Sequence, residues 1–223
     1  MKSRKRMFAW ILVLCLSLAS CQQSAPAQPE EQIAPTDPPA GEQPAGEQAP
    51  ALYFPEKNEN NVDIGELMQF SGDVFAPSAV DLYERADLVI VGTVTAELSS
   101  ESDVTLSEVL VDEVWKGNCA PGDDLTVREM GARYEDHDAS LWKVPLLREG
   151  ARVVLLLEQE QDGARGICGG CQGKCFIDGQ GLAYPYSYYV DDSDLPGAAF
   201  AEFTHSMSPD ILLPLLRGML LTD

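Results

Sequence analysis

Residues 88–96 read LVIVGTVTA, and this β-branched run decides the fold. Val, Ile and Thr are enriched in strands because their branched side chains pack well on a pleated surface. The run predicts a buried strand, and Gly92 inside it indicates a bulge or a tight bend. A short helix is predicted just before the strand, since Ser78 stands three residues ahead of Asp81 in a near capping box.

More strands are predicted after this one. Residues 105–115 alternate between apolar and polar side chains and change phase near Val114 and Trp115, which predicts a long strand with a bulge. Residues 125–129 and 151–158 predict two further strands, while residues 131–149 read as irregular and polar. The segment DGQG at 178–181 predicts a hairpin that supplies the fifth β-segment. Short strands separated by Gly and Pro favour an all-β barrel or sandwich.

Several of these segments form an ordered pattern: ADLVIVGTV at 86–94, VWKG at 114–117, PGD at 121–123, LTV at 125–127, and REG at 148–150 before VVLLL at 153–157. Together they resemble a bacterial surface-protein family. Its domain is a five-stranded OB-type barrel similar to that of the tissue inhibitors of metalloproteinases and netrin-like modules. The resemblance covers about residues 78–185 and implies an all-β, five-stranded OB-like barrel with flanking short helices. It implies a fold rather than an activity.

The first twenty-one residues have the layout of a secretory signal. Four basic residues lie within 2–6, an apolar run covers 7–18, and LASC follows at 18–21. The last four residues resemble a bacterial lipobox, which implies that residues 1–20 are removed and that Cys21 is acylated and becomes the mature N-terminus. An apolar run of about a dozen residues is shorter than the roughly 20 that a membrane-spanning helix needs. The expected location is therefore extracytoplasmic, with a lipid anchor in a bacterial membrane.

Residues 21–51 are expected to form a disordered tether. Pro, Gln, Ala, Glu and Gly dominate this stretch, and such a composition cannot bury enough apolar surface to become ordered. Its prolines favour an extended, semi-rigid chain. Residues 52–223 then remain as one folded domain. Metalloproteinase inhibition is not expected, since those inhibitors use a free N-terminal cysteine, whereas Cys21 would be acylated and far from the barrel.

The C-terminal stretch predicts a helix. Ser208 stands at the N-cap position and Pro209 at the first helical position, and Leu residues follow at helical spacing. Pro214 should kink or shorten this helix. The expected role is packing against the barrel, with partner binding as the alternative.

The charge of the chain is strongly acidic, with 15 Lys and Arg against 36 Asp and Glu and a formal net charge of −21. Four of the basic residues lie in the leader, so the mature chain is more acidic still. Such a surface repels phosphate backbones and anionic lipid headgroups, and nucleic-acid binding is therefore not expected. The charge keeps the chain soluble and favours cations or a basic partner.

The mature chain holds four cysteines besides Cys21: Cys119, Cys168, Cys171 and Cys175. An even number in an exported protein favours structural disulfides. Four thiolates also suit tetrahedral zinc, although one remote cysteine and a triplet is not the spacing of two Cys-x-x-Cys pairs. A third interpretation is a thiol-redox site at Cys168 and Cys171, although no helix of a βαβ unit is predicted there. All three interpretations stay open at this stage.

Tyrosines at 184, 186 and 188 alternate, so a strand here would present Tyr184, Tyr186 and Tyr188 on one face as a glycan or peptide platform. The alternative is core packing or cover over a sheet edge, and Pro185 favours an edge. His137 is expected in a surface loop. The sequence contains no Gly-x-Ser-x-Gly, phosphate-binding loop or His-Glu-x-x-His motif, which disfavours an enzyme. The favoured hypothesis is a non-enzymatic module that binds a protein, peptide or glycan; the alternative is a metal-binding or thiol-redox protein using the cysteines.

Overall fold

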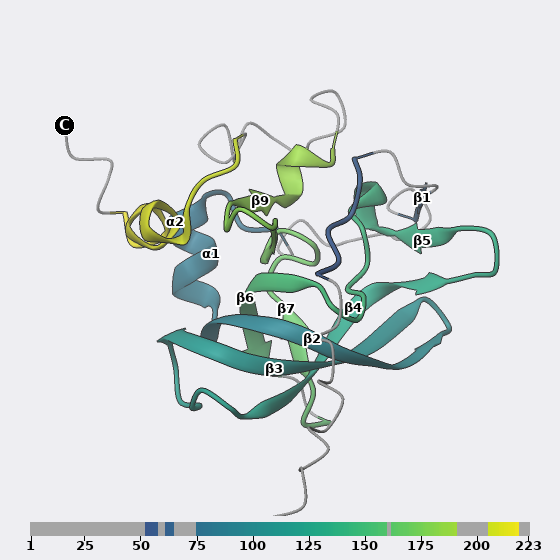
Figure 1. Cartoon of the computed structure of the whole chain (residues 1–223), viewed down its shortest axis with the longest axis horizontal. Coiled ribbons are helices and arrows are strands. Elements are labelled where there is room, and N and C mark those ends of the chain that lie inside the picture. Colours follow the sequence, from purple (N-terminus) through teal and green to yellow (C-terminus); the bar gives the residue numbers. More distant parts are fainter. Residues whose placement is uncertain (1–51, 58–60, 65–74, 160–161, 191–204, 219–223) are drawn as a thin grey trace, which may run out of the picture. The chain divides into compact units, whose positions relative to one another are not determined.

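The computed structural model describes residues 52–57, 61–64, 75–159, 162–190 and 205–218, all within one unit, Gln48–Asp223. Strands dominate this described part, which contains only two short α-helices (Figure 1). The strands are β1 (Asn61–Asp63), β2 (Leu88–Glu101), β3 (Val104–Lys116), β4 (Asp124–Arg133), β5 (Asp138–Ser140), β6 (Arg152–Gln159), β7 (Arg165–Ile167), β8 (Lys174–Ile177) and β9 (Ala183–Pro185). The helices are α1 (Ala79–Arg85), α2 (Pro209–Leu216) and the 3₁₀ turns η1 (Leu141–Lys143) and η2 (Tyr186–Tyr188).

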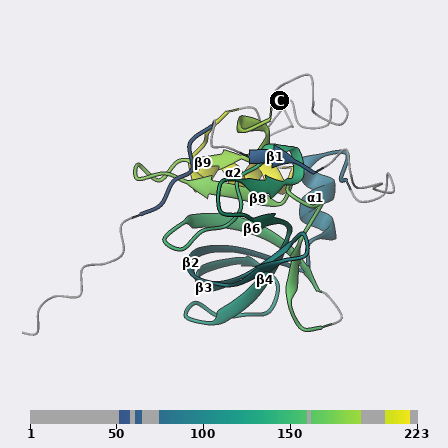
Figure 2. The ribbon, with the colours of Figure 1, turned by 90° about the vertical axis from the view of Figure 1, so that its right-hand side faces the viewer.

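Five strands close into a barrel in the order β2-β3-β4-β7-β6, with β6 returning to β2. The β4–β7 pair is parallel, and every other pair in the ring is antiparallel. The three long strands β2, β3 and β4 curl around one side of the barrel (Figure 2). This closed five-strand ring confirms the all-β, OB-like barrel expected from the sequence.

The bulges expected in the first two strands are present. The register between β2 and β3 shifts between Val91 and Gly92, and Trp115 is the extra residue between the partners of Val89 and Ile90. A Cβ atom at Gly92 would lie 2.7 Å from the carbonyl oxygen of Leu110, so only glycine fits at this close approach. Bulges increase strand coiling, which a barrel of only five strands requires.

Strand β6 joins the barrel to a smaller hairpin. Along one edge it pairs with β2, and along the other its first half pairs with β8 and its second half with β7. The expected hairpin around residues 178–181 exists as β8–β9, but it branches off the ring. The strand that closes the ring is β7, which the sequence analysis did not predict.

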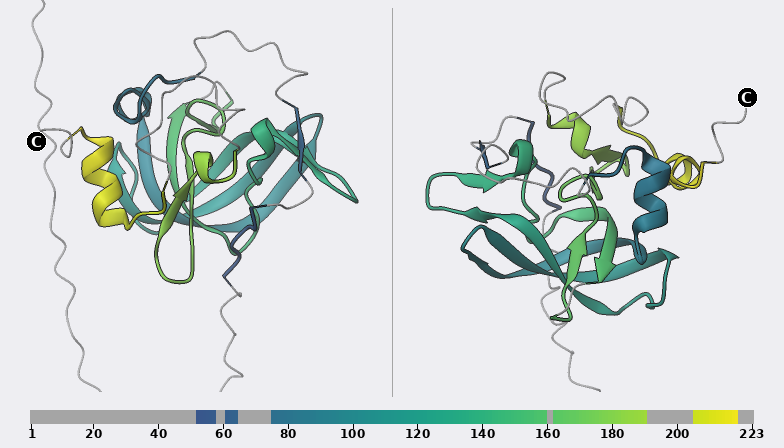
Figure 3. Two further views of the ribbon diagram at one scale, coloured as in Figure 1. Left: turned by 90° about the horizontal axis from the view of Figure 1, so that it is seen from above. Right: turned by 180° about the vertical axis from the view of Figure 1, so that it is seen from behind.

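The two α-helices pack against each other beside the barrel (Figures 1 and 3). Helix α1 begins as the capping box predicts, since the Ser78 hydroxyl accepts the backbone N–H of Asp81 at 3.1 Å. Helix α2 begins at Pro209 and buries Leu212 and Leu216. Pro214 lies two residues before the last residue of this short helix, as expected for a residue that shortens a helix.

Residues 131–149 are more ordered than the sequence predicted. Strand β4 runs to Arg133, strand β5 follows, and η1 forms a tight turn in which Trp142 has a left-handed φ of 50°. Strand β1 holds this turn in place: Asp63 accepts the Trp142 N–H at 2.8 Å, and Asn61 donates to the Lys143 carbonyl at 3.1 Å. These partners are far away in sequence, which is why local patterns did not predict the order.

A buried ion pair fastens the chain that follows this turn. The Nζ atom of Lys174 on β8 lies 2.5 Å from Oε2 of Glu129 on β4, and both side chains are at most 4% exposed. The ammonium also donates to the Pro145 carbonyl at 2.5 Å, and Oε1 of Glu129 accepts the Leu147 N–H at 2.5 Å. Each buried charge therefore has a charged partner and a further hydrogen bond, as buried charges require.

Replacing Lys174 by Met should strongly destabilise the fold, because the substitution leaves the Glu129 carboxylate buried without a counter-charge. We expect the free energy of unfolding to fall by about 3–5 kcal/mol, measured by urea denaturation. Lys143→Met changes an exposed lysine and should stay within about 0.5 kcal/mol of the parent. Adding Glu129→Leu to Lys174→Met should restore part of the loss. A Lys174→Met variant as stable as the parent would show that the pair does not fasten the fold.

Candidate functional site

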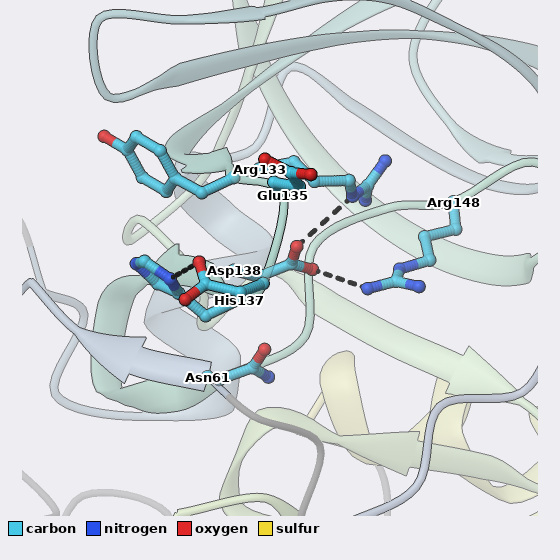
Figure 4. Close-up of a pocket in the computed structure, with 8 residues that line it drawn as sticks. Asn61, Arg133, Glu135, His137, Asp138 and Arg148 are labelled. Atoms are coloured by element: carbon cyan, nitrogen blue, oxygen red, sulfur yellow. Dashed lines mark hydrogen bonds and ion pairs between the residues drawn. The ribbon is translucent and has the colours of Figure 1, made fainter.

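A polar cavity of about 370 Å³ opens beside the β4–β5 hairpin (Figure 4). This hairpin lies at the far side of the barrel from α1 and α2 (Figures 1 and 3). The residues that line the cavity come from β1, the β4–β5 hairpin and the connection before β6, and they are all polar or aromatic. They are Asn61, Arg133, Tyr134, Glu135, Asp136, His137, Asp138 and Arg148.

Asp138 is the anchor of this cavity. Its side chain is 3% exposed, and the two neighbouring arginines point toward it from the same side (Figure 4). Arg133 donates from Nε to Oδ1 at 3.3 Å, and Arg148 donates from Nη2 to Oδ2 at 2.9 Å. Each carboxylate oxygen therefore accepts a charge-assisted hydrogen bond from a different guanidinium.

Both guanidinium groups are held by further contacts. Arg133 also donates from Nη2 to the Leu147 carbonyl at 3.3 Å and forms an ion pair with Glu97 on β2. The guanidinium of Arg148 lies 5.5 Å from the ring centroid of Tyr53 in a cation–π contact. These contacts restrain both guanidinium groups, and restrained side chains lose less conformational entropy on binding than free ones.

The rim of the cavity carries a pair of stacked rings. The rings of Tyr134 and His137 are nearly parallel, with centroids 4.9 Å apart, and Tyr134 is 48% exposed. Nδ1 of His137 lies 2.7 Å from Oδ1 of Asp136, and this hydrogen bond lowers the pKa of the Asp136 carboxyl. His137 thus lies in a surface hairpin, where it supports one face of the Tyr134 ring.

The cavity lining is dominated by hydrogen-bonding side chains. Its eight lining residues include no serine, cysteine or lysine that could act as a nucleophile. Its central carboxylate is engaged by two guanidiniums and is therefore poorly placed to abstract a proton. What the lining offers is a fixed set of donors and acceptors beside an exposed ring.

The sequence predicted no binding site here, although it predicted that His137 lies in a surface loop. The segment RYEDHD at 133–138 carries the signal, a dense run of polar and aromatic residues directly after a strand. The essential partner Arg148 lies ten residues beyond Asp138, and only the fold brings the two together.

The four cysteines are free thiols in this structure, so the expected disulfides are not found in the described part of the chain. Cys119 is half-buried in the connection between β3 and β4, whereas Cys168, Cys171 and Cys175 are buried around the β7–β8 connection. Burial raises the pKa of each of these three thiols to about 12. The described residues also contain no group of three or more His, Cys, Asp or Glu placed to share a metal ion.

The Cys-Gly-Gly-Cys segment has a structural explanation. It connects β7 to β8, two strands that pair with the same edge of β6. Leu156 of β6 bonds to both ends of the loop: its carbonyl accepts the Cys168 N–H, and its N–H donates to the Gly173 carbonyl. Gly169 and Gly170 both have left-handed φ, near +65°, and a Cβ atom at Gly169 would lie 2.4 Å from the Gln172 side chain. Gln172 in turn accepts the N–H of Ala76 at 2.8 Å, which joins the loop to the segment before α1.

The alternating tyrosines do not form a face of one strand, so that expectation is wrong. Strand β9 ends at Pro185, and Tyr186–Tyr188 form the 3₁₀ turn η2. Tyr186 is buried at 2% exposure, while Tyr184 and Tyr188 are half-buried and pack edge to face, with centroids 4.8 Å apart. The edge position that Pro185 indicated is confirmed, since β9 ends the sheet.

Cys21, the signal segment and the tether lie outside the described residues. None of the helices in the described part is long and apolar enough to cross a membrane. In comparisons with known proteins, no family model matches this chain, and no curated protein shows significant sequence similarity to it.

The buried thiols should react slowly. Alkylation requires the thiolate, and a pKa near 12 keeps Cys168, Cys171 and Cys175 protonated at pH 8. In native protein treated with iodoacetamide at pH 8, peptide mass mapping should find Cys119 labelled first and the other three protected. Unfolding without reductant should expose all four to labelling. A cysteine that is labelled only after reduction would instead reveal a disulfide.

Proposed function

We propose that this protein is a lipid-anchored binding protein on the outer face of a bacterial membrane. Its OB-like barrel binds a small polar ligand or polar chain end in the cavity beside the β4–β5 hairpin. The observation that carries the proposal is the Asp138 carboxylate held between Arg133 and Arg148 in an open cavity lined by polar and aromatic side chains.

The anchoring half of the proposal rests on the sequence. A basic head, a short apolar run and LASC at 18–21 favour lipid attachment at Cys21, and residues 21–51 suit a tether that holds the barrel away from the membrane. Two or more acyl chains give stable attachment, whereas one chain alone is marginal. Such a protein meets its ligand in the extracytoplasmic space.

The state of the cysteines favours a binding function over the thiol-redox and metal-binding alternatives. Three of the four cysteines that such chemistry would use are buried, and burial raises their pKa, whereas thiolates are the metal ligands and nucleophiles. Tyr186 is too buried to meet a ligand. Tyr184 and Tyr188 remain a second candidate surface. A ligand bound there should be weakened by Tyr188→Ala, whereas a ligand bound in the cavity should not.

Replacing Cys21 by Ser should abolish lipid attachment. We expect the parent to enter the detergent phase in Triton X-114 partition and the variant to enter the aqueous phase, with intact mass showing the absence of acyl chains. Cys15→Ser changes the other leader cysteine and should leave partitioning unchanged. A Cys21→Ser protein that still enters the detergent phase would contradict the anchor.

Binding through the cavity should depend on Arg148. A panel of neutral sugars, amino acids, dipeptides, dicarboxylates and polyamines can be screened against the detergent-solubilised protein by ligand-observed NMR. Loss of a hydrogen bond from a charged group costs about 1.5–3 kcal/mol, so Arg148→Ala should weaken a genuine ligand at least tenfold.

Arg152→Ala is the matched control, because Arg152 pairs with Asp112 on another face and does not line the cavity. Circular dichroism verifies that both variants fold. The proposal fails if no member of the panel binds, or if every ligand found binds the Arg148→Ala variant as well as the parent.

A further inference from the structure

A second cavity, of about 310 Å³, opens in the barrel wall where β7 lies between β4 and β6. It shares no lining residue with the polar cavity beside the β4–β5 hairpin. Its volume is at the lower end of the range for small-molecule sites, so it suits a small ligand. The lining residues are Val104, Arg128, Glu129, Met130, Glu158, Gly166, Ile167 and Gly170.

The register of three strands explains the hollow. Gly166 of β7 is directly opposite Arg128 of β4 on one side and Glu158 of β6 on the other. Residues in register point to the same face of a sheet, so the two charged side chains flank a position that has no side chain. Neighbouring strands lie about 4.8 Å apart, and the backbones of Arg128 and Glu158 are therefore separated by roughly 10 Å.

Apolar side chains supply another part of the lining. Val104 of β3 and Met130 of β4 are opposite each other in register and share a face, and Ile167 of β7 also lines the cavity. Small-molecule sites typically combine such side chains with a few polar groups that orient the ligand. A ligand with an apolar body fits this part of the cavity.

One charge in the lining has no counter-charge. Arg128 forms an ion pair with Asp162, and Glu129 forms the buried pair with Lys174. Within the part of the chain that the structure describes, no hydrogen bond or ion pair engages the half-buried carboxylate of Glu158. The cavity therefore carries one unbalanced negative charge beside its apolar side chains.

This combination disfavours three classes of ligand. An anion would be repelled by Glu158 and by a chain whose net charge is −21. An uncharged apolar molecule would cover the Glu158 carboxylate and remove its water without supplying a partner. A hard divalent metal ion needs about six oxygen ligands, and the other carboxylate of the lining, that of Glu129, is engaged by Lys174.

We propose that the second cavity binds a small organic ammonium ion with an apolar body, an alkyl- or arylamine. The ammonium group pairs with the Glu158 carboxylate, and the body packs against Val104 and Met130. An ion pair in such a partly apolar site is stronger than the same pair in bulk water. This site is separate from the polar cavity, and the proposal does not depend on the proposed function.

Four probes test the two halves of this ligand. Benzylamine, benzyl alcohol and benzoate share one ring and are cationic, neutral and anionic at pH 7, whereas methylamine has the ammonium group without the ring. Their affinities for the complete, detergent-solubilised protein can be compared by ligand-observed NMR titration. We expect benzylamine, or its homologue phenethylamine, to bind about tenfold more tightly than each of the other three probes.

A Glu158→Gln substitution tests the site, because it removes the charge and keeps the shape of the side chain. It should weaken benzylamine about tenfold, since the ammonium group loses a charged partner. Glu84→Gln is the matched control: it makes the same change of charge at an exposed residue of α1 that does not line the cavity, and it should leave the affinity unchanged. Comparison in one detergent also subtracts partition of the probe into micelles, and circular dichroism verifies that both variants fold.

Three results would overturn the proposal. The first is that neither arylamine binds more tightly than benzyl alcohol and benzoate. The second is that arylamine binding is the same in Glu158→Gln as in the parent, which would place the amine elsewhere. The third is that methylamine binds as tightly as benzylamine, which would show that the apolar side chains take no part. None of these results bears on the polar cavity, which Arg148→Ala tests separately.

Discussion

The buried pair between Glu129 and Lys174 is the contact on which the rest of the structure depends. It joins a barrel strand, β4, to the branching hairpin strand, β8, and it holds the chain between them through Pro145 and Leu147. Arg148 follows directly, and the Leu147 carbonyl accepts a hydrogen bond from Arg133. The geometry of the polar cavity is thus set by a charge pair inside the protein, and a ligand would meet guanidiniums that are already in position.

Strand β6 explains why the barrel and the hairpin form one sheet. A single edge of β6 accepts two partners in succession, β7 and then β8, and the Cys-Gly-Gly-Cys loop makes the transition between them. The loop needs two residues with left-handed φ at Gly169 and Gly170, and it buries the flanking thiols. Chain geometry thus accounts for the two glycines of this motif.

The sequence predicted those parts of the fold whose causes are local. The β-branched run of β2, the Ser78 cap, the Gly92 bulge and the hairpin at 178–181 all depend on neighbouring residues, and all are present. Strand β7 was missed because only three residues form it, and its pairing with β4 and β6 is entirely long-range. The cavity was missed for the same reason, since Asn61, Asp138 and Arg148 are polar residues without a motif until the fold brings them together.

The acidic composition connects these features. A mature chain with so few cations has little positive charge to distribute, and the structure uses much of it in internal contacts: Lys174 with Glu129, Arg152 with Asp112, and Arg128 with Asp162. The two guanidiniums at the cavity are likewise balanced, by Asp138 and Glu97. Paired charges keep the directionality of their hydrogen bonds. In the folded chain these hydrogen bonds join the β4–β5 hairpin to the segment before β6, which fixes the geometry of the cavity.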